Sequence, residues 1–394
     1  MSNNLFPKKI EQNLPNWLKS LNDYSSEKIE KIGILKKSDD FKYSKLFKIV
    51  QSNFSLKKSK IIKESKAPNS ITIVNSSIAN SQIEEGIKVA NLNDIANSPA
   101  EINEFIENEN SCYLTTLNHS LLNVGALVEV DSSPSLPLNI EYLAEENSSM
   151  ATSINIKVGD GVDLKLIERI NSPCQSLISS KIKITLGKGS SVKHLRKFES
   201  EGLLASVVEV EMAERSIFRS FNFSKGGEMN RNNFKINFNG EKGDAKIEGL
   251  YLCSGSHVDN SILVKHNRPH CKNYQKFKGI LDKNASGAFT SMVLVPDGSN
   301  GSEATQINKT ILLDKDSEMN SRPQLSIFND DVKCGHGSTI GQLDEAAIFY
   351  LQSRGIEREK AIKLISRGFI DEILSGAEDL REEIEQLIEE GEKN

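Results

Sequence analysis

A strand-and-turn repeat in the middle of the chain limits its fold more than any other feature. An apolar strand runs into a polar turn and then into a second strand in ITLGKGSSVKHL, VEMAERSIFRSF and INFNGEKGDAKI. The three turns begin at Gly187, Ala213 and Asn239, a constant step of 26 residues (213 − 187 and 239 − 213). Two weaker copies, ILDKNASGAFTS and ILLDKDSEMNSR, follow further along the chain.

A repeat of this length predicts a solenoid, because one coil of strands and turns cannot bury its apolar side until other coils stack on it. Helical periodicity is missing from about residue 110 to 330, which excludes a doubly wound α/β sheet. A β-sandwich is the alternative, but the regular step favours a β-helix. The sequence therefore predicts a mainly β protein with a β-helix core.

The segment before the repeat has a helical pattern. Apolar residues recur at helical spacing between Ile10 and Leu21, and Pro15 suits the first turn of a helix. A second helix is expected over residues 41–50. The polar residues 51–69 read as a linker, and the ITIV segment directly after them reads as a strand.

The segment after the repeat is also helical. Leu343 and Leu351 belong to one apolar stripe, and Gly355 is placed to end that helix. A second stripe contains Ile362, Ile365, Phe369 and Ile373, and a third follows Gly376. Such a bundle either caps the solenoid or presents a face to another protein. The chain thus divides into an N-terminal helical domain with linker (1–69), a β-helix core (70–340) and a C-terminal helical domain (341–394).

Composition and motifs argue against several classes of protein. The net charge of -5 indicates no broad surface for nucleic acid. No apolar run reaches the roughly 18 residues of a membrane-spanning helix, and the N-terminus lacks a secretory signal. Five scattered cysteines without a CxxC pair fit reduced thiols in a cytoplasm, or in an organelle stroma after removal of a transit peptide. No GxxxxGK[ST], GxSxG or HExxH motif is present, so we expect no enzyme with its own nucleotide site.

The segment NDDVKCGHGSTIG holds the best candidate site. Cys334 and His336 stand two residues apart, so in an extended chain their side chains point to the same side. Both types of side chain bind iron and iron–sulfur clusters. Two ligands do not complete such a site, so further ligands would come from elsewhere, including a second chain. A turn role is favoured for Asp330 and Asp331.

The remaining histidines are weaker candidates for metal binding. His257, His266 and His270 lie in one stretch, with Cys271 next to His270. Turn and surface roles are commoner for such residues than metal ligation, and the same holds for His119 and His194.

The candidate segment also carries a family resemblance. RPQLSIFNDDVKCGHGSTIGQLDEAAIFYLQSRGI and the KAIKLISRGFIDEIL that follows resemble the C-terminal signature of the SufB/SufD family. The similarity continues upstream through QINKTILL, HVDNSILVKHNRPH and LNHSLLNVGALVEV, so it covers nearly the whole chain. KKSDDFKYSKL is similar to an acidic–aromatic–Lys–Tyr–Thr motif of the family, with Phe41 for tryptophan and Ser44 for threonine. Leu351 stands where SufB-like chains carry a cysteine, which favours the SufD branch.

The resemblance implies a right-handed parallel β-helix core between N-terminal and C-terminal α-helical domains. It implies a scaffold subunit of the SUF iron–sulfur cluster assembly system, joined through its β-helix to a SufB-like paralogue. His336 takes the position of a histidine implicated at that interface, with Cys334 beside it, and the cargo would be iron or a nascent cluster held transiently. A SufC-like ATPase would bind the C-terminal helices around Phe349, Ile362, Ile365 and Phe369.

Two other functions remain open. A bare β-helix is common among carbohydrate-active enzymes, although these need rows of acidic and basic residues along a groove and this chain offers only the pair Asp330 and Asp331. A homodimeric interaction protein without metal chemistry is the other possibility, and a homodimer is also compatible with a scaffold isolated from its partners.

Overall fold

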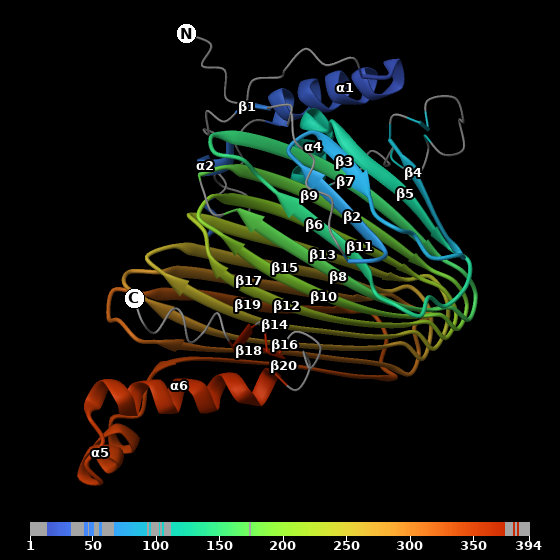
Figure 1. Cartoon of the computed structure of the whole chain (residues 1–394). Coiled ribbons are helices and arrows are strands. Elements are labelled where there is room, and N and C mark those ends of the chain that lie inside the picture. The colour runs from blue at the N-terminus through green and yellow to red at the C-terminus, as the bar shows by residue number, and fades with distance from the viewer. Residues whose placement is uncertain are drawn as a thin grey trace.

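Two long parallel sheets form the body of the protein (Figure 1). The computed structural model describes residues 14–32, 43–45, 47–50, 55–56, 67–92, 94–95, 102, 105, 112–172, 175–374, 381–382 and 384–385. One sheet, here the odd sheet, contains β5 (Val124–Val130), β7 (Ser148–Val158), β9 (Leu177–Leu186), β11 (Leu203–Met212), β13 (Met229–Phe238), β15 (His257–His266), β17 (Ser286–Val295) and β19 (Glu318–Ile327). The even sheet contains β6 (Leu138–Leu143), β8 (Asp163–Ser172), β10 (Ser191–Ser200), β12 (Ile217–Gly226), β14 (Asp244–Ser254), β16 (Lys272–Asp282), β18 (Ser302–Leu312) and β20 (Val332–Gln342).

The chain alternates between the two sheets, so each coil adds one strand to each of them. Strands of the same sheet pair in parallel with the strand one coil earlier and one coil later. The predicted β-helix class is therefore confirmed, as a parallel β-solenoid of about eight turns. The predicted step is also seen, since Ser180 and Ser206 lie 26 residues apart on neighbouring strands with their side-chain oxygens 3.0 Å apart.

Later coils are longer, but the strands keep their length. Val332 pairs with Ser302, and Glu318 pairs with Ser286, so the step has grown beyond 26 residues. The extra residues enter the turns, and this keeps the register of the sheets unbroken. Side chains one coil apart consequently stack about 4.8 Å from one another.

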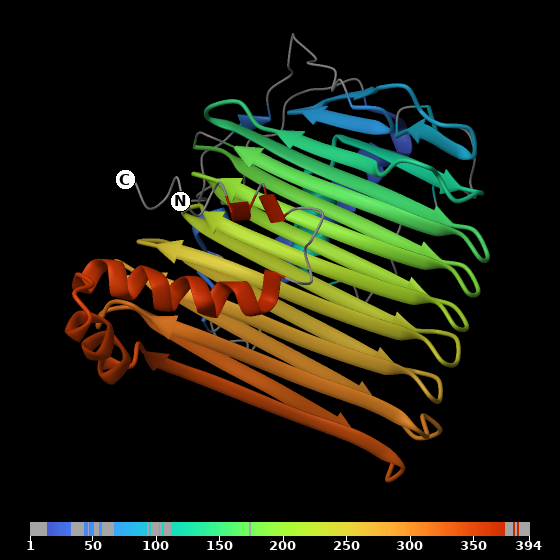
Figure 2. The same ribbon diagram turned by 60° about the horizontal axis from the view of Figure 1, so that its bottom comes forward.

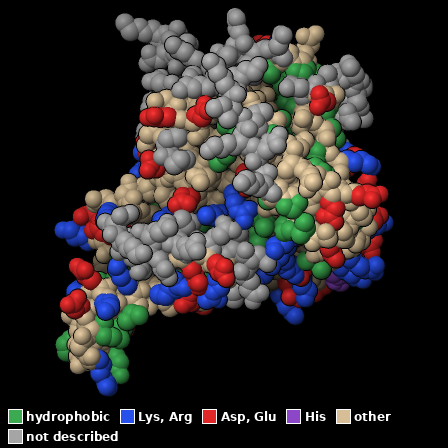
Figure 3. Space-filling view, viewed as in Figure 1, with side chains coloured by type: hydrophobic (Ala, Val, Ile, Leu, Met, Phe, Trp, Pro, Cys, Tyr) green, Lys and Arg blue, Asp and Glu red, His purple; other side chains and the backbone are tan. Residues whose placement is uncertain are grey.

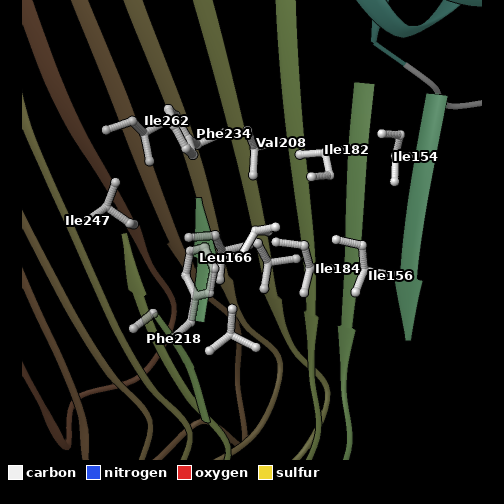
Figure 4. Packing of buried hydrophobic residues seen from close by; sticks show 14 of the residues in the cluster. Ile154, Ile156, Leu166, Ile182, Ile184, Val208, Phe218, Phe234, Ile247 and Ile262 are labelled. Atoms are coloured by element: carbon white, nitrogen blue, oxygen red, sulfur yellow. The ribbon is translucent and has the colours of Figure 1, made fainter. Parts of the chain in front are cut away.

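The core lies between the two sheets and consists of these stacks. Ile182, Val208, Phe234 and Ile262 form one stack along the odd sheet, all almost fully buried (Figure 4). Leu166 and Phe218 face them from the even sheet (Figure 4). Alternate residues of each strand point inward, because successive side chains of a strand lie on opposite faces of its sheet.

Helices cover the outer face of the odd sheet near its start. They are α1 (Asn16–Ile32), α2 (Phe47–Val50) and α4 (Tyr113–Leu121). Apolar residues of α1, α2 and α4 cluster with Leu177, Leu203 and Met229 from the outer face of the sheet. The predicted first helix is present, but it starts at Asn16, so Pro15 precedes its first turn, and Ile10 lies outside the described residues.

Two sequence-based expectations about helices were wrong. The helix expected over residues 41–50 is much shorter in the described residues, because Tyr43–Lys45 are not helical and α2 begins at Phe47. Lys45 instead reaches the odd sheet, where its Nζ donates to Ser286 Oγ at 2.8 Å. α4 lies in a region expected to lack helices. The linker 51–69 contains the short strand β1 (Ser55–Leu56), which pairs with β7, and the rest of it is described only from residue 67.

The two ends of the solenoid differ. At the N-terminal end, β2 (Ser70–Val74) is followed by β3 (Ser77–Asn80), which pairs with it in an antiparallel hairpin, and β4 (Ile87–Asn91) lies antiparallel to β5. β3 and β4 are the outermost strands of the two sheets at this end, and each has one neighbouring strand among the described residues. At the C-terminal end, β19 and β20 each have a single neighbouring strand among the described residues.

The C-terminal helices extend from the last coil (Figure 2). Helix α5 (Glu345–Ser353) ends before Gly355, which has a φ of +82° as expected of a helix-ending glycine. Helix α6 (Arg358–Leu374) crosses the outer face of the even sheet, where Ile370, Ile373 and Leu374 are buried. Of the third predicted helix, four residues are described as helical, including the buried Ile384.

Glu168, His194 and Arg196 form a buried ionic cluster inside the solenoid. Arg196 Nε donates to Glu168 Oε2 at 2.6 Å, and His194 Nε2 lies 3.1 Å from the same oxygen. Burial alone would raise the pKa of Glu168, but Arg196 and His194 outweigh it and lower that pKa to about 2. The carboxylate therefore stabilises the fold above pH 4.5, and this contribution fades as the pH falls from 4.5 towards 2.

We predict that Arg196→Met lowers the free energy of unfolding at pH 7 by about 3–5 kcal/mol, because it leaves a buried carboxylate without its counter-charge. The deficit should shrink as the pH falls towards 2, because without Arg196 the buried carboxyl has a higher pKa and becomes protonated at a higher pH than in the unmodified chain. Urea unfolding followed by circular dichroism measures both effects. The control is Arg219→Met, since Arg219 pairs with Asp244 at the surface and should contribute about 0–1 kcal/mol. Equal losses for the two variants would contradict the prediction.

Candidate functional site

Strand β20 forms the C-terminal edge of the even sheet and carries Cys334 and His336. In register with β18, Cys334 lies beside Ala304 and His336 lies beside Gln306. Ala304 and Gln306 are fully buried and point into the solenoid. Cys334 and His336 therefore occupy inward-facing positions of the last coil, on the same side of the strand as predicted.

No further coil covers these two positions in the part of the chain that is described. Cys334 is half-buried and packs against the core, and burial raises the pKa of its thiol. His336 is exposed, although its register partner Gln306 has no accessible surface. An imidazole at a core position is thus open to solvent because the solenoid ends there.

The other face of β20 is unusually bare. Gly335, Gly337 and Gly341 occupy outward positions, and a Cβ atom at any of the three would meet open space. Glycine is therefore not required there by the packing of this chain itself. The arrangement leaves the backbone of the edge strand accessible to another surface.

The acidic pair before β20 forms a turn. The Asp331 N–H donates to Asn329 Oδ1 at 3.0 Å, and the Asp331 carbonyl accepts from the Gly301 N–H at 2.7 Å. These bonds are typical of the turn role that the sequence favoured.

The histidines of the middle segment do not come together. His257 lies on the outer face of the odd sheet, where Nδ1 is 2.8 Å from Ser286 Oγ, whereas His266 lies at the far end of β15 and faces the core. His270 occupies a turn with a φ of +59°. Within the described residues, no group of three or more histidine, cysteine, aspartate or glutamate side chains is arranged to hold a metal ion.

Helices α5 and α6 form an arm, of which α6 lies on the even sheet and α5 projects beyond the solenoid at one corner (Figure 3). Phe349 on α5 is 72% exposed, and the neighbouring Tyr350 and Leu364 are also exposed. Ile362 and Ile365 are half-buried. Phe369 lies against the even sheet, with Lys278 Nζ 4.1 Å from its ring centroid.

Lys278 anchors the arm to the solenoid. Its Nζ donates to the carbonyl oxygen of Phe369 at 2.6 Å and to the carboxylate of Glu372 at 2.5 Å. Lys276 on the same strand also donates to Glu372, at 2.8 Å. Lys276 and Lys278 lower the pKa of Glu372 to about 2, and the carboxylate therefore stays charged at neutral pH.

The residues that surround the candidate site inside the last coils were not found from the sequence. Gln275, Ser291 and Gln306 are buried polar residues on inward-facing positions. Polar residues at alternate positions in a strand such as QINKTILL indicate that one face of the strand is polar. Which of these residues lie near the site depends on the register between coils, which the sequence alone does not give.

Comparison with known proteins decides the family. Residues 142–369, more than half of the chain, match the family described as SUF system FeS cluster assembly, SufBD core domain. The chain belongs to the SufBD family. The family match ends inside α6 and includes the whole of β20, so the candidate site lies within the family's core domain.

Several curated relatives carry SUF names. An iron–sulfur cluster assembly SufBD family protein of Synechocystis is 31% identical over 194 residues, 48% of this chain and 43% of the relative. The iron–sulfur cluster assembly protein SufD of Escherichia coli is 26% identical over 256 residues, 62% of this chain and 60% of that protein. SufD of Bacillus subtilis is 23% identical over 278 residues, 66% and 62% of the two chains. The chain therefore spans about half the length of the relatives it matches.

Among the described residues of this SufBD-family chain, no helix is both long enough and apolar enough to span a membrane.

We predict that diethyl pyrocarbonate modifies His336 in the folded full-length chain at least about ten times faster than His194, His257 and His266. The three buried rings can react only when the structure opens locally, whereas His336 is exposed. Peptide mass spectrometry over time measures each rate. A His336 rate as slow as that of the buried rings would contradict an open last coil.

Proposed function

We propose that this chain is a SufD-like scaffold subunit on which iron–sulfur clusters are assembled at an interface with a SufB-like partner. The observation that carries the proposal is the exposed His336 at a core position of an uncovered last coil. A second solenoid that pairs with this edge would enclose the imidazole and bring its own ligands to it.

In this proposal His336 binds iron or the nascent cluster through a neutral ring nitrogen. Cys334 lies two residues away on the same side of β20 and is the second, less exposed candidate ligand. The cluster is cargo, and its remaining ligands come from the partner. In the absence of that partner, two copies of this chain would pair through the same edge strand to form a homodimer.

The bare outer face of β20 supports pairing through the edge strand. Three outward positions lack side chains, so a partner's backbone can approach this strand without displacing any. Unpaired edge strands are the usual sites at which sheets of two chains join.

The arm is the proposed docking site of a SufC-like ATPase. Phe349 and Tyr350 present an apolar surface away from the solenoid, and Ile362 and Ile365 lie on the adjoining helix with part of their surface open. Phe369 contributes indirectly, by holding α6 on the even sheet. A movement of the bound ATPase would be transmitted from α6 to the even sheet through the contact between Glu372 and Lys278. This would rearrange the partner interface.

We predict that His336→Ala leaves the chain folded and bound to its partners but lowers the iron and acid-labile sulfide recovered with the complex by at least about tenfold. The measurement is affinity purification from cells that depend on this chain, followed by iron and sulfide assays. Ser338→Ala is the matched control, because Ser338 is the next exposed inward-facing position of β20. Normal cluster content in the His336 variant would refute the proposed site.

We predict that Phe349→Ala together with Tyr350→Ala weakens binding of the ATPase about 30-fold, as expected for the loss of central aromatic anchors worth about 2 kcal/mol. Isothermal titration calorimetry with the purified ATPase measures the effect. Tyr24→Ala serves as the control, because Tyr24 on α1 is similarly exposed, at 57%, but lies outside the arm. Unchanged affinity in the double variant would exclude this docking surface.

A further inference from the structure

The interior of the last coils contains an ordered chain of polar side chains where an apolar core is usual. Gln306 Nε2 lies 2.6 Å from Ser291 Oγ, and Ser291 Oγ lies 2.5 Å from Gln275 Oε1. Gln275 Nε2 in turn donates to Asn273 Oδ1 at 2.8 Å. All four residues are at most 4% exposed. The chain runs across the two sheets and ends directly next to the last strand.

The direction of these hydrogen bonds follows from the number of protons. The hydroxyl of Ser291 has one proton, which it donates to Gln275 Oε1, so it must accept a proton from Gln306. The Gln306 amide therefore directs Nε2 towards Ser291 and towards the carbonyl of Gln324, 3.3 Å away. Its orientation is fixed by its neighbours, and Oε1 is left as a free acceptor.

Gln306 Oε1 is buried and has no hydrogen-bond partner among the described residues. A buried acceptor of this kind is rare in folded proteins unless something else satisfies it. The inward-facing residue on the next strand, in register with Gln306, is His336. In-register side chains of neighbouring parallel strands lie about 4.8 Å apart, within reach of a small rotation of either side chain.

We propose that Gln306 is the positioning residue of His336, its Oε1 accepting a hydrogen bond from one ring N–H so that the other ring nitrogen points out of the last coil. The inference rests on the proposed function for the role of that second nitrogen. Histidines that bind metals usually donate their other N–H to a fixed oxygen, which selects the tautomer and the ring orientation. The polar chain back to Asn273 keeps this oxygen in place.

The test uses the full-length chain labelled with ¹⁵N-histidine. Two-bond ¹H–¹⁵N correlation spectra report the tautomer of each ring, and His336→Ala assigns the His336 signals. We expect one dominant tautomer in the unmodified chain and a mixture in Gln306→Met, which keeps the size of the side chain but removes the acceptor. Thr310→Val is the matched control, because Thr310 is another buried inward-facing polar residue of β18 whose register partner is Ile340.

The same variants are assayed for iron and sulfide in cells. We expect Gln306→Met to lower recovered cluster about 10–100-fold, and Thr310→Val to leave it unchanged. Identical His336 ring spectra in Gln306→Met and in the unmodified chain would overturn the positioning role, whatever the cluster yield. Normal cluster yield in His336→Ala would instead refute the proposed function, while the ring spectra would still decide whether Gln306 orients His336.

Discussion

The in-register stacking of parallel coils is the constraint on which the rest of the structure depends. Each inner strand satisfies its backbone groups on the strands one coil before and one coil after it, so neither sheet tolerates a shift of register. The stacking also arranges side chains in columns, and this places Ile182, Val208 and Phe234 on top of one another. The backbone register fixes the position of every side chain in a column. The positions of polar side chains are therefore as well defined as those of apolar ones.

Such columns explain how a site can arise at the end of a solenoid. His336 lies at a position that, one coil earlier, is occupied by the buried Gln306. The backbone there is held in register by the buried coil before it, and the side chain is exposed because no further coil covers it in the described part of the chain. A side chain that is held at a fixed position is usually buried and closed to ligands. In the last coil of a solenoid, a side chain can be held in register and still be exposed.

Much of this architecture follows from the sequence, for identifiable reasons. The 26-residue step predicted the stack, and the two-residue spacing of Cys334 and His336 predicted their common side. Helix α4 was missed because all nine of its residues are buried between α1 and the odd sheet although five of them are polar, so its polar residues do not mark a solvent-exposed face. The neighbour of His336 was not predictable either, because the coils lengthen towards the C-terminus and the register of β20 on β18 no longer follows the 26-residue step.

The different ends of the solenoid have a consequence for assembly. At the N-terminal end the outermost strands, β3 and β4, run antiparallel to their neighbours, whereas β19 and β20 keep the parallel order of the coils. A further parallel coil would therefore continue the columns of side chains at the C-terminal end. In the proposed pairing, a contact between two such like ends would be isologous, and a pair joined in this way is closed.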